Sequence, residues 1–362
     1  MSIEQTGLLS GAVSLFIAFL ITPFVIKFAW KYNIVDDPKK HKHPKVIHKY
    51  PVPRGGGLAT YIAIAITSLI FLPLDKHLLA ILGGTTLLLL MGLIDDKKNL
   101  SPYPRLFVQF LAAGIPIAAG IGIAFITNPF GGIIDLSSWQ ISIEVFGETR
   151  NLWVLSSVFA VFWIVIVINF LNWGAKGVDG QFPGVVGIAG ATIAILSLKF
   201  SADITQWPVI ILASIVAGAY IGFLPWNFYP QKIMPAFSGA NIAGYLLAIL
   251  TVLSTTKVGT LLVVLGVPLI DSAYTFFRRI LAGRSPFWGD RGHLHHKLLD
   301  YGFSKRQVAV FYWGITLLLA ILAINLNSKS KFYTIIFVIL FVGVLLFWLT
   351  SNQKIKNKLR TS

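Results

Sequence analysis

Two adjacent carboxylates, Asp95 and Asp96, end an apolar stretch that reads LLLLMGLIDDKKN, and two lysines follow them at once. Like charges side by side repel each other, so the pair needs an explanation. One interpretation is a helix end in water, where both charges are solvated. The other is a chemical role, because short carboxylates beside Lys and Arg suit a magnesium ion and phosphate groups. The polar residues in the rest of the chain decide between the two.

Two other polar segments contain residues that suit an anion. In NIVDDPKKHKHPKVIHKYPVPRGGGLA, prolines and glycines prevent a helix, and Arg54 precedes three glycines whose backbone N–H groups offer an anion site where the next helix begins. An ordinary basic loop beside the membrane is the alternative. In VINFLNWGAKGVDGQFPG, Asn169 and Asn172 fall on the last turn of an apolar run, and Asp179 lies in a glycine-rich turn. Because an unpaired Asn at that depth is costly, this segment predicts a polar cleft rather than a lipid-facing surface.

The segment RRILAGRSPFWGDRGHLHHKLLD contains three histidines within four residues, His293, His295 and His296. Zinc is the first ligand to consider, but the chain has no cysteine, which argues against a zinc site. Imidazoles beside arginines favour a lip that binds phosphate or handles protons. A solvated basic loop is the alternative. The neighbouring arginines are Arg278, Arg279, Arg284 and Arg291.

The composition of the chain determines its class. It has 362 residues, of which 56% are hydrophobic and 12% charged, and its mean hydropathy is +0.76. Soluble domains carry about 25% charged residues, so too few polar residues remain here to cover a water-facing surface. We therefore expect an all-α polytopic membrane protein. The absence of cysteine excludes disulfides and thiolate metal sites. The N-terminus lacks the basic leader and cleavage site of a signal peptide, so we interpret the first apolar run as a retained span.

A helix needs roughly 20 apolar residues to cross the hydrocarbon core of a bilayer. The chain contains about eleven such runs. The predicted spans are residues 7–29, 56–73, 77–94, 106–127, 152–171, 184–200, 207–225, 238–254, 258–280, 308–326 and 332–350. Between the fourth and the fifth, the weakly alternating segment WQISIEVFGE predicts a small β-hairpin or an amphipathic segment.

The basic residues orient these spans. With the N-terminus outside, 24 of the 30 Lys and Arg residues fall on the inner side and 6 on the outer side. The positive-inside rule describes this bias for short loops, so we expect the C-terminus in the cytoplasm. The whole chain, 1–362, then forms a single integral membrane domain. Its predicted cytoplasmic loops are about 30–55, 95–105, 172–183, 226–237 and 281–307. A net charge of +16 suits anionic lipid headgroups and phosphorylated ligands and requires no nucleic acid partner.

The acidic residues favour chemistry at the inner rim of the membrane. All three glutamates fall outside in this topology, whereas eight aspartates fall inside, most of them at span ends or in short loops. A transporter would place ionisable groups near the bilayer midplane, in broken helices of two matching halves. A transporter is therefore the weaker interpretation.

Five motifs occur in order along the predicted inner loops. They are His48-x-x-Pro51-x-Pro53-Arg54-x-Gly56-Gly57, Gly92-Leu93-Ile94-Asp95-Asp96 with Arg105 and Gln109, Asn169-x-x-Asn172, FLPWNFYPQKI and GDRGHLHHKLLDYGFSKRQ. Together they resemble the motifs of the polyprenyl-phosphate N-acetylhexosamine-1-phosphate transferases, the membrane superfamily (glycosyltransferase family 4) that includes the phospho-N-acetylmuramoyl-pentapeptide transferase. The resemblance covers nearly the whole chain. It looks closer to the N-acetylglucosamine-1-phosphate branch, because the last motif matches that branch's DRxHxHHxLL segment.

The resemblance implies a reaction. In this superfamily a polyprenyl phosphate such as undecaprenyl phosphate attacks the sugar-bearing phosphorus of a UDP-N-acetylhexosamine, UMP leaves, and a polyprenyl-diphospho-sugar remains. It implies Mg²⁺ as the cofactor, with Mn²⁺ as an alternative, since positive charge must offset the repulsion between two anions. One aspartate of the pair would take a proton from the lipid phosphate or position it, and the other would help to hold the metal. We accordingly expect the first membrane step of cell-wall or surface-polysaccharide synthesis, at the cytoplasmic face of the inner (plasma) membrane, and we consider a homodimer.

Carried over residue by residue, the resemblance predicts the site. The predicted catalytic residues are Asp95, Asp96 and His293, and the predicted metal ligands are Asp95, Asp96 and Asp179. The predicted substrate-binding residues are His48, Arg54, Arg105, Asn169, Asn172, Lys176, Arg278, Arg291, His295 and His296. The expected partners are a polyprenyl phosphate lipid, a UDP-sugar and the bilayer lipids.

The chain departs from the superfamily pattern at two carboxylates. The usual NLxDGLDG is here NWGAKGVDG, one residue longer, with Ala175 and Lys176 where the first Asp is expected. The usual MGDSG is here PAFSG, so Phe237 replaces an Asp that ligates the metal. Either another Asp completes the coordination, or Lys176 replaces part of the metal's charge, or catalysis is lost. We expect an active transferase, and the alternative is a degenerate homologue that acts as a binding or scaffold protein in the membrane.

Overall fold

The structure is a computed structural model that describes residues 1–40, 46–145, 148–254, 257–287 and 289–361. These residues form thirteen α-helices and one 3-10 helix. The helices are α1 (Ile3–Lys31), α2 (Gly57–Phe71), α3 (Lys76–Lys98), α4 (Pro102–Ala118), α5 (Val154–Gly174), α6 (Gln181–Leu198), η1 (Ile204–Gln206), α7 (Trp207–Asn227), α8 (Ala236–Leu253), α9 (Lys257–Val264), α10 (Gly266–Leu281), α11 (Leu294–Tyr301), α12 (Lys305–Asn325) and α13 (Ser328–Thr361).

Three short antiparallel sheets complete the described structure. They pair β1 (Val35–Asp36) with β2 (Val52–Pro53), β3 (Phe125–Thr127) with β4 (Ile133–Asp135), and β5 (Gln140–Val145) with β6 (Glu148–Trp153). The last pair is a β-hairpin in which Gln140 lies opposite Trp153, so the hairpin that the alternating segment predicted is confirmed.

Among the described residues, eight helices are long and apolar enough to cross a membrane: α1, α3, α5, α6, α7, α8, α12 and α13. The pair α9 and α10 passes the same test together, although the two helices meet at an angle of 87°. These nine correspond one to one with nine of the predicted spans. The all-α polytopic membrane class is thereby confirmed, whereas the count of eleven and the orientation of the termini stay predictions.

The two remaining predicted spans are shorter helices. Helix α2 is apolar but has 15 residues, and α4 has 17 residues and ends at Ala118 rather than near residue 127. The chain leaves the α-helical path there because Gly120 adopts a φ of +99° and the N–H of Ile121 donates back to the carbonyl of Pro116. The residues after this turn form β3 instead of the last turns of a helix.

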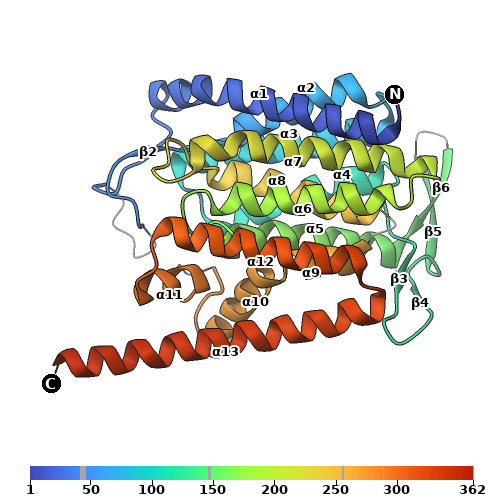
Figure 1. Cartoon of the computed structure of the whole chain (residues 1–362). Coiled ribbons are helices and arrows are strands. Elements are labelled where there is room, and N and C mark those ends of the chain that lie inside the picture. Colours follow the sequence, from blue (N-terminus) through green and yellow to red (C-terminus); the bar gives the residue numbers. More distant parts are fainter. Residues whose placement is uncertain (41–45, 146–147, 255–256, 288, 362) are drawn as a thin grey trace.

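The long helices lie side by side as a bundle, with α13 along one edge and α10 running obliquely near it (Figure 1). Helix α8 is the central helix, since 94% of its residues are buried inside the protein. Its approach to α5 is close enough that a Cβ on Gly244 would lie 2.5 Å from the Cα of Ile168. A helix that is apolar on all sides and buried on all sides is the expected centre of such a bundle.

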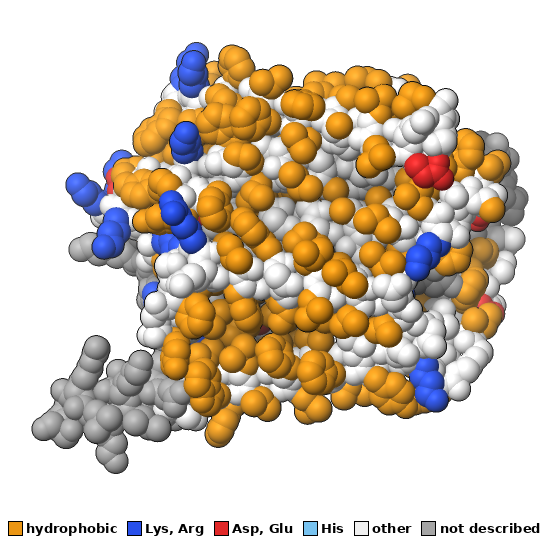
Figure 2. All heavy atoms as spheres, in the orientation of Figure 1, with side chains coloured by type: hydrophobic (Ala, Val, Ile, Leu, Met, Phe, Trp, Pro, Cys, Tyr) orange, Lys and Arg blue, Asp and Glu red, His pale blue; other side chains and the backbone are white. Residues whose placement is uncertain are grey.

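The flank of the bundle in Figure 2 is covered by hydrophobic side chains between a cluster of Lys and Arg at the left and fewer charges at the right. Many of these side chains are large and exposed, such as Phe24 and Leu340 at 64% and 62%. An apolar surface of this extent suits lipid tails and would be unfavourable in water.

The described residues of the five segments predicted to form the cytoplasmic loops gather at one end of the bundle, the end of β2 and α11, while β3 to β6 lie at the other end (Figure 1). The charge bias predicts which side each end faces. A reporter fused after Lys358 should be cytoplasmic, and one inserted near Ser138 should be external, because 24 of 30 basic residues fall on the inner side. Protease protection or a compartment-specific fluorescent reporter measures both. The opposite pair of results would place every proposed site residue on the wrong side of the membrane.

Candidate active site

A cavity of about 290 Å³ lies at the loop end of the bundle. Arg54, just before α2, forms part of its wall. The rest comes from the ends of α3, α4, α5 and α8, from the turn after α5, and from the segment that leads into α11. Nine of the residues predicted to bind or react line it: Arg54, Asp95, Arg105, Asn169, Asn172, Lys176, His293, His295 and His296. The fold thus brings together side chains that are up to about 240 positions apart in the sequence.

Asp95 is the carboxylate that faces this cavity. It lies on the last turn of α3, which ends because Asn99 adopts a left-handed conformation with a φ of 50°. One carboxylate oxygen accepts the N–H of Leu100 at 2.9 Å and lies 3.6 Å from Nη1 of Arg105. The other oxygen lies 4.0 Å from Nη2 of Arg54. Two guanidinium groups therefore offset the charge of Asp95 from the side of the cavity.

Asp96 points to α8 instead, and its oxygens are occupied by the protein. It accepts the backbone N–H groups of Phe237 at 2.8 Å and Ser238 at 3.3 Å, and the hydroxyl of Ser238 at 2.6 Å. It also lies 3.4 Å from Nη2 of Arg54. A carboxylate at a helix N-terminus satisfies donors that the helix itself cannot pair, so Asp96 acts as the cap of α8.

The contact between Asp96 and α8 requires two helices to approach closely, and glycines allow it. A Cβ on Gly92, one turn before Asp96, would lie 2.4 Å from the Cα of Ser238. A Cβ on Gly57, at the start of α2, would lie 2.4 Å from the N of Gly239. Any larger residue at these positions would push the start of α8 away from the Asp pair.

Lys176 brings a third positive charge to the Asp pair. Its Nζ donates to the carbonyl of Ala236 at 3.2 Å, and the side chain lines the cavity beside Asp95. Burial lowers the pKa of Lys176 to about 8, although the nearby Asp96 acts in the opposite direction. Two carboxylates therefore face three cations, counting Arg54 and Arg105, and the cluster carries a net positive charge that suits a phosphate.

Asn169, near the end of α5, is paired, as a polar cleft requires. Nδ2 of Asn169 donates to Gln109 at 2.7 Å and to the carbonyl of Val165 at 2.9 Å, and Nε2 of Gln109 donates to Asn241 at 3.1 Å. This chain of amides connects α5, α4 and α8. Oδ1 of Asn172 is buried and has no hydrogen-bond partner, and it belongs to the cavity wall, so it is available to a ligand.

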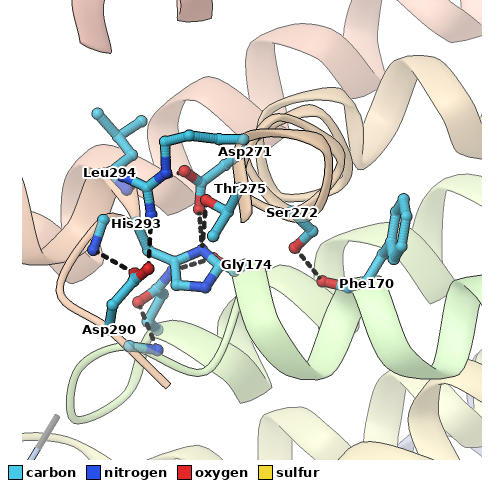
Figure 3. A network of polar contacts seen from close by, with 12 residues as sticks. Phe170, Gly174, Asp271, Ser272, Thr275, Asp290, His293 and Leu294 are labelled. Carbon is cyan, nitrogen blue, oxygen red and sulfur yellow. Dashed lines mark hydrogen bonds and ion pairs between the residues drawn. The ribbon is translucent and has the colours of Figure 1, made fainter. Parts of the chain in front are cut away.

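The histidines form one wall of the cavity. The rings of His293 and His295 stack with centroids 5.4 Å apart and planes at 7°, and the ring of His296 lies 4.4 Å from that of His295. The glycine-rich turn after α5 packs on them, since a Cβ on Gly177 would lie 2.1 Å from the ring of His295. Nδ1 of His293 contacts Asp271 of α10 at 2.9 Å (Figure 3).

The family model described as "Glycosyl transferase family 4" matches residues 78–255, a range that contains the Asp pair, both asparagines and Lys176. Together with the relatives described next, this match confirms the predicted superfamily and makes the chain an enzyme of the glycosyl-1-phosphate transferase type.

Three relatives match the chain over most of its length. The probable undecaprenyl-phosphate N-acetylglucosaminyl 1-phosphate transferase of Bacillus subtilis is 29% identical over 345 residues, covering 92% of this chain and 89% of the relative. The undecaprenyl-phosphate alpha-N-acetylglucosaminyl 1-phosphate transferase of Escherichia coli is 27% identical over 359 residues, covering 95% and 90%. The phospho-N-acetylmuramoyl-pentapeptide-transferase of Caldanaerobacter subterraneus is 28% identical over 327 residues, covering 86% and 94%.

Five predicted site residues do not line this cavity, and one of them is Asp96, which caps α8. Asp179 and His48 line a neighbouring cavity of about 480 Å³, and Asp179 is paired there with Nζ of Lys305 at 3.3 Å. Arg278 contacts Asp290 at 2.7 Å, and Arg291 forms an ion pair with Asp300. The residues Arg54, Lys176 and Gly177 line both cavities and so form the wall between them.

The residues present do not fit a magnesium ion bound by Asp95, Asp96 and Asp179. Within the described ranges, no group of three or more His, Cys, Asp and Glu residues is placed to hold a metal. Asp96 is occupied by the start of α8, and Asp179 is paired with Lys305 in the other cavity. The ring of Phe237 lies 4.9 Å from the guanidinium of Arg105, so the position where the family has an Asp is used for a cation–π contact. Magnesium therefore stays a prediction from the resemblance, and the arrangement of these three aspartates does not support it.

Sequence reasoning missed the support behind His293. Arg279, 3% exposed, lines the cavity but was predicted only as part of the basic lip, and Asp271 was predicted only as an inner aspartate. Burial would raise the pKa of Asp290, but hydrogen bonds from Arg279 and from the N–H of Gly292 hold it well below its usual range. Asp271 and Asp290 precede His293 by 22 and 3 residues, and these two spacings give no periodic signal. Only the fold shows that these groups lie together.

Proposed function

We propose that this family 4 enzyme transfers an N-acetylhexosamine-1-phosphate from a UDP-sugar to undecaprenyl phosphate or another polyprenyl phosphate and releases UMP. The observation that supports it most is the cavity at the end of an apolar bundle, where Asp95 and His293 face Arg54, Arg105, Lys176 and Arg279. A lipid phosphate anchored by its tail would meet a soluble nucleotide sugar at such a place. The names of the Bacillus subtilis and Escherichia coli relatives support undecaprenyl phosphate as the acceptor and N-acetylglucosamine 1-phosphate as the group transferred.

The reaction joins two anions, and the residues of the cavity suit that task. An oxygen of the lipid phosphate attacks the sugar-bearing phosphorus, a new P–O bond forms, and the bond from that phosphorus to UMP breaks. The proton of the lipid phosphate passes to a base in the cavity, for which Asp95 and His293 are the candidates. The surrounding cations offset the charge of the diphosphate, which is the main way proteins accelerate phosphoryl transfer.

The second cavity is proposed to take part in nucleotide binding. It adjoins the first across Arg54 and Lys176, and its volume of about 480 Å³ lies in the usual range of small-molecule sites. Apolar side chains such as Ile47 and Phe182 share its wall with Asp179 and Asn227. Phosphates held at the shared wall would leave the uridine in one cavity and the sugar in the other. We place both cavities at the cytoplasmic face of the plasma membrane, on the charge bias of the loops.

The purified full-length protein tests this proposal. Incubated with undecaprenyl phosphate and a panel of UDP-N-acetylhexosamines, it should release UMP in equal amount to a lipid-linked sugar phosphate, and no UMP should form without the lipid. Each donor is assayed without divalent metal and over a range of Mg²⁺ and Mn²⁺. If no donor yields UMP at any metal concentration, while UDP-sugar or lipid phosphate still binds, the chain is a degenerate homologue that binds without reacting.

A further inference from the structure

A buried carboxylate lies directly behind the histidine of the cavity. Asp271 belongs to α10, is 0% exposed, and does not line either cavity. One of its oxygens lies 2.9 Å from Nδ1 of His293, and the other accepts the backbone N–H of Leu294 at 2.9 Å (Figure 3). Asp271 thus fixes both the ring of His293 and the first turn of α11. Thr275, one turn further along α10, lies 3.5 Å from the same ring nitrogen.

The second nitrogen of the ring faces a group that can only donate. Nη2 of Arg279 lies 3.5 Å from Nε2 of His293. The guanidinium is held in place by two contacts with Asp290, at 3.2 and 3.3 Å, and by the carbonyl of Pro286 at 2.7 Å. An ionised carboxylate only accepts hydrogen bonds and a guanidinium only donates them. Both neighbours of His293 therefore select one tautomer, in which Nδ1 carries the proton and Nε2 carries the lone pair.

We propose that Asp271 is a positioning residue for the reaction, which holds His293 with the lone pair of Nε2 at the cavity so that it accepts the proton of the lipid phosphate. This inference rests on the proposed transfer. The lipid phosphate monoanion gives its O–H proton to Nε2, its oxygen then forms the bond to the sugar-bearing phosphorus, and UMP takes the electron pair of the broken bond. Asp271 stays ionised and stabilises the imidazolium that forms. Arg279, beside Nε2, binds the phosphate that delivers the proton.

The tautomer of His293 tests the inference without any assay of activity. Full-length protein with ¹⁵N-labelled histidine in detergent is compared with the His293→Gln variant, whose missing signals identify His293. The inference expects His293 in the neutral protein to carry its proton on Nδ1. A proton on Nε2 would overturn it.

The Asp271→Asn variant tests the consequence for the reaction. The amide oxygen can still accept from Leu294 N–H, but the amide nitrogen donates to Nδ1 and should shift the proton of His293 to Nε2. We expect kcat to fall at least about 100-fold, with the KM for the UDP-sugar within about threefold, because no substrate contact is lost. The ¹⁵N signals of His293 should move to the other tautomer. Unchanged kcat, or a loss that resides in KM alone, would contradict a positioning role.

Ser272→Ala is the matched control. Ser272 is the next residue of α10, is fully buried, and donates to the carbonyl of Phe170 at 2.6 Å without touching His293 (Figure 3). Its loss removes a buried hydrogen bond from the same helix, so a comparable fall in melting temperature with kcat within about twofold separates positioning from general destabilisation. A wild-type protein that releases no UMP would refute the proposed function, whereas normal turnover in Asp271→Asn would refute only the role of Asp271.

Discussion

Asp95→Asn should lower turnover by about two orders of magnitude or more while the protein stays folded. Asp95 is the carboxylate in the wall of the cavity, and two guanidinium groups hold it there with its oxygens 3.6 and 4.0 Å from them. The amide keeps the shape and can still accept from Leu100, but it can neither take a proton nor balance the charge of the arginines. UMP release under saturating substrates measures the effect. The melting temperature of the detergent-solubilised protein shows that the fold is kept.

Asp96→Asn should behave differently, because Asp96 caps α8. Three donors, from Phe237 and from the N–H and hydroxyl of Ser238, converge on its two oxygens, and an amide NH₂ would face at least one of them. We expect lower activity together with a loss of stability of about 1–3 kcal/mol. Asp75→Asn is the matched control, in which a different capping carboxylate is changed to the amide. Asp75 caps the N-terminus of α3 by accepting the N–H of Leu78, and Asn caps a helix equally well. If Asp95→Asn works within a few-fold of the parent, Asp95 is merely a charged helix end.

Lys176→Ala should reduce turnover by about two to three orders of magnitude, the usual cost of losing one group that stabilises charge in a transition state. Lys176 stands where the family pattern has an Asp, lines both cavities and lies beside the Asp pair. If its ammonium supplies the charge that the resemblance assigns to a metal ion, excess Mg²⁺ should restore the variant only in part. Turnover across a Mg²⁺ titration, for the parent and the variant, measures both expectations.

Lys199→Ala is the control for this change. Each of the two lysines donates from Nζ to a backbone carbonyl of another segment, Lys176 to Ala236 and Lys199 to Ile324, but Lys199 lines neither cavity. It should turn over at the parental rate. If Lys176→Ala leaves both the rate and the Mg²⁺ half-point unchanged, Lys176 does not act in place of a metal, and the role of the missing carboxylates lies elsewhere.

The membrane class, most of the spans and the segments of the site followed from composition and motifs alone. Apolar runs of about 20 residues predict helices because a helix of that length spans the bilayer and pairs its backbone groups within one segment. Where a run contained a glycine turn, as at Gly120, the helix ended early, since a hydropathy pattern does not register backbone conformation. The motifs that gather at the cavity were recognisable because each is a short continuous segment of the sequence.

The sequence by itself determined which residue types meet at the loop end of the bundle, but only the tertiary structure decided what each one faces. Adjacent residues of a helix point about 100° apart, so Asp95 reaches the cavity while Asp96 caps α8. Asp179 is two residues from Gly177, which lines both cavities, yet Asp179 lines only the second, where it pairs with Lys305. The pairing of Asp271 with His293 joins a buried helix to a loop. Such contacts depend on how helices pack against one another, which no local pattern along the chain encodes.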